Sequence, residues 1–184
     1  MAGGYYKTAI RVKKDAAPID NITKFAWDDG DYEEVEEWVE YTKEEVEERK
    51  QYYIDVSKSK LSEYLESNPL LSSCHNNTEA FYSITKEKQN LLLQNYSSYT
   101  IKKQNGLEAV LTWNATGEVC EEWTENELLQ LIAEMDAVVK PLITQQQKYE
   151  KDIVICEDLS VIEKMDFDYS VADIRKQNTE SKEI

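Results

Sequence analysis

The sequence predicts a helix-rich α+β protein with an extended N-terminal arm, a long helix and a compact helix–β-hairpin–helix domain. Two threonine capping boxes, one hairpin signal and an uneven distribution of apolar residues lead to this prediction. Apolar residues are sparse in the first third of the chain and frequent in residues 78–170, so the rear segment should hold the hydrophobic core. The predicted organisation is an arm at 1–41, a helix at 42–69, a domain at 78–170 and a polar, mobile tail at 171–184.

The arm contains three short segments with strand character. Residues 7–14 alternate weakly, residues 24–27 form a second extended piece, and residues 34–41 form a third. The arm has too few apolar residues to bury a core of its own. Its order must therefore come from contact with the rear domain or with another molecule.

A long helix should begin at the capping box Thr42-Lys43-Glu44-Glu45 and end before Asn68-Pro69. In such a box the threonine hydroxyl accepts a hydrogen bond from the amide three residues later, and the glutamate reaches back. The apolar positions of this helix form a thin stripe: Val46, Tyr53, Ile54, Leu61, Tyr64 and Leu65. A thin stripe fits a seam against another subunit, or a helix lying across the following domain. Residues 68–77 should form a loop.

The rear domain should start with a helix that Thr85 caps and that runs to about Lys103. Its inner face is expected to contain Leu91, Leu92, Tyr96 and Tyr99. Residues 107–113 and 118–123 flank Asn114-Ala115-Thr116-Gly117, which predicts a β-hairpin with a four-residue loop that ends in glycine.

A second capping box, Thr124-Glu125-Asn126-Glu127, opens a helix with the strongest apolar stripe of the chain. The stripe contains Leu128, Leu131, Ile132, Met135, Val138, Val139 and Leu142. Pro141 should kink this helix, because its ring displaces a backbone hydrogen bond one turn earlier. A short helix at 158–165 and an extended segment at 166–169 should follow.

The composition argues against several classes of function. Lys and Arg number 21 against 37 Asp and Glu, which gives a formal net charge of −16. General nucleic-acid and anionic-membrane binders need clustered Lys and Arg. No apolar stretch approaches the roughly 18 residues of a membrane span, and the first residues lack the apolar region of a secretory signal. We therefore expect no nucleic-acid partner and no membrane partner.

The sequence also lacks the patterns typical of an enzyme. His75 is the single histidine, and adjacent residues of an extended chain point to opposite sides, so Cys74 and His75 should not form a nucleophile–base pair. Cys74, Cys120 and Cys156 are odd in number and far apart, which predicts three reduced thiols. Cys120 should lie in a strand and Cys156 at a helix end. We predict no enzymatic activity and no cofactor.

Acidic residues crowd positions 28–48, and aromatic residues lie among them. A calcium site is one interpretation, but Asp28-Asp29-Gly30-Asp31 lacks the spacing of a calcium loop, so we predict no metal. The other two interpretations are a solvated acidic face and a surface complementary to a basic partner. The aromatic residues are candidate partner-binding anchors unless they fold back on the rear domain: Phe25, Trp27, Trp38 and Tyr41. Trp113 and Trp123 should instead pack against the helix that follows them.

Several segments together resemble small proteins encoded in the tail, baseplate or fibre region of tailed phages and prophages of Gram-positive bacteria. These segments are 32–42, 81–89, 107–113, 121–124, 139–142 and 145–150. The resemblance covers about residues 32–170 and implies a component of the virion tail, made in the host cytoplasm, or a factor in tail-fibre assembly. It transfers no site residue to this chain.

These observations predict a non-enzymatic phage tail protein, associated with the baseplate or a tail fibre. Its arm and long helix would dock onto a neighbouring tail subunit, and a homo-oligomer is a further expected partner state. One alternative is a tail-fibre assembly chaperone that is absent from the mature particle. Another is an acidic inhibitor that mimics nucleic acid, whose binding moderate salt would abolish.

Overall fold

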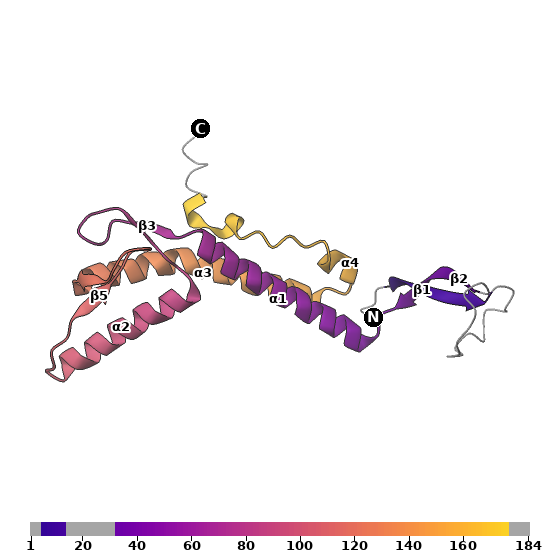
Figure 1. The fold of residues 1–184 in the computed structure, drawn as a ribbon, viewed down its shortest axis with the longest axis horizontal. Coiled ribbons are helices and arrows are strands. Elements are labelled where there is room, and N and C mark those ends of the chain that lie inside the picture. Colours follow the sequence, from indigo (N-terminus) through magenta and orange to yellow (C-terminus); the bar gives the residue numbers. More distant parts are fainter. Residues whose placement is uncertain (1–4, 14–31, 177–184) are drawn as a thin grey trace, which may run out of the picture. The chain divides into compact units, whose positions relative to one another are not determined.

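The computed structural model describes residues 5–13 and 32–176, with side chains from residue 40 onward. The fold is mixed α+β and rich in helix, as predicted (Figure 1). Its contacts divide the chain into two compact units. Unit 1 contains Met1–Tyr53 and Ile155–Met165, and unit 2 contains Ile54–Val154 and Asp166–Ile184. The division falls inside the long helix, whereas the sequence analysis placed boundaries before and after it.

Unit 1 contains an antiparallel ribbon of two strands, β1 (Tyr5–Lys13) and β2 (Tyr32–Glu40). The strands pair along their whole length, and neither joins a third strand within the described residues. Both lie close to the strands predicted at 7–14 and 34–41. The extended piece predicted at 24–27 lies outside the described residues.

The first helix, α1 (Lys43–Ser67), begins at the predicted capping box. The Thr42 N–H donates to a carboxylate oxygen of Glu45 over 2.8 Å, and the Glu45 N–H donates to Thr42 Oγ1 over 3.2 Å. The first turn buries Val46, which belongs to the predicted apolar stripe. Local sequence therefore sets the position at which α1 starts.

The short helix α4 (Leu159–Ile162) also belongs to unit 1. Asp158 caps it by accepting a hydrogen bond from the backbone N–H two residues later, over 2.8 Å. The helix is shorter than the predicted 158–165. Its first and last residues, Leu159 and Ile162, are both buried. Glu163, just after α4, lies 3.8 Å from the guanidinium of Arg49 in α1.

The core of unit 2 is built on α3 (Glu125–Ile155), which begins at the second capping box. The helix continues through Pro141 without interruption, so the break in backbone hydrogen bonding is local. Its buried residues include most of the predicted stripe: Leu128, Leu131, Met135, Val138, Val139, Leu142, Gln146 and Ile153. Ile132, also predicted to face inward, is half-buried.

A small hairpin follows α1, although the sequence predicted a loop at 68–77. Its strands are β3 (Leu70–Ser72) and β4 (Ala80–Tyr82), which pair antiparallel. The prediction was wrong for residues 70–72, because a three-residue strand is too short to display the alternation by which strands are recognised, whereas residues 73–77 form the expected loop. The Asn68-Pro69 pair does follow the end of α1, as predicted.

The helix α2 (Lys86–Gln104) starts at Thr85, whose hydroxyl accepts a hydrogen bond from the Lys88 N–H. Leu92 is its one buried residue. Two other residues of the predicted inner face, Tyr96 and Tyr99, are half-buried, whereas Leu91 is exposed. None of the described helices has a stretch long and apolar enough to cross a bilayer.

The predicted central hairpin is present as β5 (Leu111–Trp113) and β6 (Glu121–Trp123), which pair antiparallel. Both strands are shorter than predicted, and the connection between them is correspondingly longer. Cys120 therefore lies outside the strand and is exposed, contrary to expectation. Cys156 does follow directly on the end of α3.

Residues 166–176 belong to unit 2, although the sequence predicted a polar, mobile tail from residue 171 onward. Asp173 is fully buried and accepts hydrogen bonds from Arg175 Nε over 2.8 Å and from the Tyr64 hydroxyl over 2.8 Å. The Tyr169 hydroxyl donates to the Ser57 carbonyl over 2.8 Å. Burial alone would raise the pKa of Asp173, but the hydrogen bonds from Arg175 and Tyr64 lower it below its usual value.

This segment contains a short 3-10 helix, Ser170–Ala172, and residues 166–169, which were expected to be extended, belong to neither a helix nor a strand. The tail prediction rested on polarity alone. A buried carboxylate is acceptable here because a guanidinium and a hydroxyl satisfy it.

Candidate functional site

Of the four aromatic residues predicted to bind a partner, the structure describes two, and it places the side chain of only one of these. Phe25 and Trp27 lie outside the described residues, and Trp38 lies in β2, where the backbone is described. Tyr41 is half-buried before α1, and its hydroxyl accepts a hydrogen bond from Arg49 over 3.3 Å. The guanidinium also lies over the Tyr41 ring, 5.9 Å from its centroid. Tyr41 thus has a contact within its own chain, and the partner-binding roles of all four residues stay predictions.

The register of β1 and β2 sorts the positions of the ribbon onto two faces. Directly paired residues share a face, and successive residues along a strand alternate between faces. Ile10 pairs with Val35 and Tyr6 with Val39. The face that contains these pairs, called the apolar face below, comprises Tyr6, Thr8, Ile10, Val12, Glu33, Val35, Glu37 and Val39.

The opposite, mixed face carries charges of both signs. It comprises Tyr5, Lys7, Ala9, Arg11, Lys13, Tyr32, Glu34, Glu36, Trp38 and Glu40. Arg11 lies directly across from Glu34, a pairing of opposite charges that favours this register. The sequence predicted the two strands but not the apolar face, because pairing between distant segments is not visible in a local pattern.

A ribbon of two strands is marginally stable at best without a surface that covers its apolar face. Each strand also has an edge that no other strand of the described chain occupies. Such edges can accept a further strand from another protein. The ribbon is therefore a candidate docking element.

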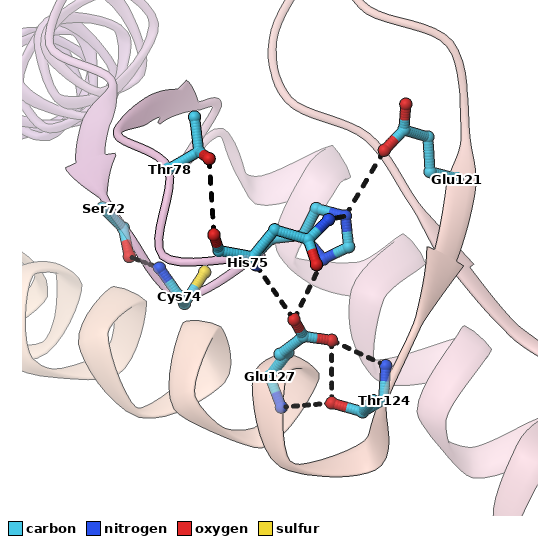
Figure 2. A network of polar contacts seen from close by, with 8 residues as sticks. Ser72, Cys74, His75, Thr78, Glu121, Thr124 and Glu127 are labelled. Atoms are coloured by element: carbon cyan, nitrogen blue, oxygen red, sulfur yellow. Dashed lines mark hydrogen bonds and ion pairs between the residues drawn. The ribbon is translucent and has the colours of Figure 1, made fainter.

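A second cluster lies in unit 2, where His75 lies between the carboxylates of Glu121 and Glu127 (Figure 2) and beside the indole ring of Trp123. Its Nδ1 is 3.3 Å from Glu127 and its Nε2 is 3.4 Å from Glu121. The imidazole stacks on Trp123 with 4.4 Å between ring centroids and 2° between the planes. The Asn76 side-chain amide lies 3.0 Å from Nε2. The approach of Nδ1 to Glu127 is electrostatic, because its geometry is not that of a hydrogen bond.

Glu127 connects the loop that contains His75 and Asn76 to the start of α3. Its carboxylate accepts hydrogen bonds from the Asn76 N–H over 3.0 Å, the Thr124 N–H over 2.8 Å and the Thr124 hydroxyl over 2.7 Å (Figure 2). The Asn76 hydrogen bond outweighs the effect of burial and, with those from Thr124, lowers the pKa of Glu127 to about 2. Glu127 is therefore ionised at neutral pH and holds no proton that it could donate.

The thiol next to His75 has a separate environment. Burial raises the pKa of Cys74, so this thiol is protonated at neutral pH. The Cys74 N–H donates to the Ser72 hydroxyl over 3.1 Å, and the thiol interacts with Ser72 and Tyr82. Cys74 and His75 thus have different partners, which agrees with the expectation that they do not act as a pair.

The His75 cluster borders a cavity of about 370 Å³. Glu79, Glu118 and Glu121 line it, and no Lys or Arg does. Trp113 and Trp123 also line it, but both are buried, as expected.

The aromatic and cation–π contacts of the two indoles involve His75, Tyr82 and Lys88, and their packing against α3 stays a prediction. His75 covers one face of Trp123 and Tyr82 meets its edge, while the Lys88 ammonium lies 5.8 Å from the Trp113 ring centroid. The contacts of His75 and Asn76 with Glu121 and Glu127 join the loop before β4 to β6 and to the start of α3.

The sequence predicted both the Thr124–Glu127 capping box and a loop at 68–77, but not that this loop binds to the box. The local signal was Asn76-Asn77, since both residues have positive φ (51° and 52°) and asparagine tolerates that conformation better than most residues. Within the described residues, no group of three or more His, Cys, Asp or Glu is arranged to hold a metal ion. No family model matches the chain, and no curated protein or solved structure is similar to it.

Proposed function

We propose that the protein is a non-enzymatic structural component of a phage tail, in the baseplate or beside a tail fibre. It binds a neighbouring tail subunit through the ribbon of β1 and β2. The observation that supports this proposal most is the apolar face of the ribbon, where Tyr6, Ile10, Val12, Val35 and Val39 share one side of a sheet of only two strands.

The ribbon suits a contact that is both apolar and specific. Full burial of an Ile, Val or Tyr side chain contributes about 1.5–3 kcal/mol, so a few such residues can offset the cost of association. The charged positions of the mixed face would remain at the rim or face water. The free strand edges would add backbone hydrogen bonds if the partner presents a strand.

The assignment to a phage tail is supported by the resemblance of residues 32–170 to small proteins of phage tail regions. The acidic character of the chain adds a preference for a partner surface with basic residues, because complementary charges speed association and favour the correct partner. Phe25, Trp27, Trp38 and Tyr41 remain proposed contact residues in this arrangement.

The first test is mass spectrometry of purified particles of the phage that encodes the chain. Stoichiometric amounts relative to other tail proteins are expected. If the protein is absent from particles but binds fibre protein in lysates, the chaperone hypothesis is correct and the structural proposal is wrong.

The second test compares two substitutions that add the same charge on opposite faces of the ribbon. Val35→Lys places an ammonium on the apolar face and should reduce incorporation into particles at least about tenfold, since desolvating an unpaired charge is costly. Ala9→Lys places it on the mixed face and should leave incorporation nearly unchanged. Circular dichroism checks that both variants keep the helical content of the parent. Equal incorporation of the two variants would contradict docking through the apolar face.

A further inference from the structure

The helix α2 has two contrasting sides. On its inner side Leu92 is 1% exposed, and the Asn95 side chain donates to the Thr112 carbonyl over 2.6 Å. Near its end, Lys103 forms an ion pair of 2.7 Å with Glu125 at the start of α3. These contacts fix the inner side within unit 2.

The other side of α2 is exposed, uncharged along most of its length and partly apolar. Leu93 is 51% and Ile101 60% exposed. A shallow depression on this side is lined by Asn90, Leu93, Gln94, Ser97, Ser98, Ile101 and Lys102, and these residues are called the outer face of α2 below. From Gln89 to Ile101 the sequence has no charged residue, although 32% of the chain is charged. This is therefore a neutral surface on a strongly acidic protein.

We propose that the outer face of α2 is the contact between two copies of this chain, which pair with their α2 helices antiparallel. Charge identifies the partner. Two copies that each carry a net charge of −16 repel one another, so they approach most easily where neither presents an acidic residue. A foreign protein could instead bring basic residues to this acidic molecule and would have no need of a neutral face.

The arrangement of residues on the outer face is self-complementary. Leu93 lies about one turn before Ser97, and Ile101 about one turn after it. A two-fold axis near Ser97 and Ser98 therefore brings Leu93 of each copy to Ile101 of the other. The small serines at the centre allow the helix axes to approach closely, and the Asn90 and Gln94 amides supply donors and acceptors around the apolar contacts.

The contact involves neither the ribbon nor any phage protein, so it can exist or fail independently of the proposed function. Sedimentation equilibrium of the full-length chain tests it directly. Association should strengthen several-fold between about 0.05 M and about 0.5 M salt, because salt screens the repulsion between the copies. A monomer at every concentration up to about 1 mM, or a dimer that weakens with salt, would overturn the proposal.

A pair of matched substitutions locates the contact. Leu93→Lys should weaken dimerisation at least about tenfold, because it places two like charges in the interface. Ile143→Lys changes another exposed aliphatic residue, 40% exposed on α3, and should change the dimerisation constant less than about twofold. A Leu93→Lys protein that dimerises like the parent would place the contact elsewhere and refute the proposal.

Disulfide crosslinking tests the antiparallel orientation. In a Cys120→Ser, Cys156→Ser background, Ser97→Cys should form a covalent dimer on mild oxidation, because the two copies of this residue meet at the axis. Asn90→Cys should not, since its copies would lie about 20 Å apart along the helix axes. Crosslinking of both variants to the same extent would indicate parallel helices, and crosslinking of neither would exclude this contact; both results contradict the proposal.

Discussion

The two capping boxes share one sequence pattern and one local geometry, but they have different roles in tertiary structure. At the start of α1, the Thr42 N–H donates to Glu45 over 2.8 Å and the Glu45 N–H donates to Thr42 Oγ1 over 3.2 Å. At the start of α3, the same two distances for Thr124 and Glu127 are 2.8 and 3.3 Å. Each threonine hydroxyl also contacts its glutamate, over 2.9 and 2.7 Å.

The difference lies in what else folds onto the second box. Glu127 also accepts a hydrogen bond from the Asn76 N–H, and His75 lies beside it. The same carboxylate that caps a helix therefore also fixes a loop about fifty residues earlier in the chain. The capping box determines where the helix begins. The segment that packs on the box determines how much stability is lost when the box is removed.

The largest expected difference in the loss of stability is between alanine substitutions of the two glutamates, Glu127 and Glu45. Glu127→Ala removes the acceptor of one loop amide and of the Thr124 N–H, so it should lower the free energy of unfolding by about 3 kcal/mol. Glu45→Ala removes only exposed hydrogen bonds within its own box and should cost clearly less. Guanidinium titration followed by circular dichroism measures both values. Equal losses would show that the loop contributes nothing to the second box.

The stabilising effects of the two capping boxes should also depend differently on acidic pH. The pKa of Glu127 lies at about 2, below its usual 4.5, so its stabilising effect is complete above pH 4.5 and is lost as the pH falls towards 2. Glu127→Gln keeps the shape of the side chain but not its charge. We expect the parent to exceed this variant in stability by about 2 kcal/mol at pH 7, with the difference disappearing near pH 2. A difference that does not change over this pH range would contradict the role assigned to the ionised carboxylate.

A double-mutant cycle isolates the contribution of the loop. His75→Ala and Glu127→Ala affect neighbouring groups and should show a coupling energy of about 1 kcal/mol. The control cycle pairs His75→Ala with Glu45→Ala, which lies in the other unit, and its effects should add within about 0.5 kcal/mol. Coupling of the same size in both cycles would mean that the His75 cluster acts by a general effect on stability.

The sequence allowed most helices to be predicted because their signals are local. The capping residues Thr42, Thr85 and Thr124 and the apolar stripe of α3 lie within the segments they describe. Of the ribbon, the sequence indicated the strands but not their pairing. The apolar face became visible only when Ile10 was found opposite Val35.

The remaining features depend on contacts between distant segments. Asp173 lies in a stretch that looks like a polar tail, and its burial depends on Tyr64, which is 109 residues away. The His75 cluster likewise joins a loop, a strand and a helix end, which no periodic pattern connects. A polar residue carries little information about its own burial, because that depends on whether a distant partner satisfies it.

The smallest expected difference is between the two capping threonines. Thr42→Ala and Thr124→Ala should each lower the free energy of unfolding by about 1 kcal/mol, and the two values should agree within about 0.5 kcal/mol. The reason is that each threonine forms the same three hydrogen bonds with its own glutamate. Hydrogen exchange of the first-turn amides of α1 and α3, read by mass spectrometry, measures the two effects separately. A clearly larger loss of stability for Thr124→Ala than for Thr42→Ala would show that Thr124 also helps to hold the loop. Equal losses would show that the Glu127 carboxylate holds it, because only that group binds a residue outside its capping box.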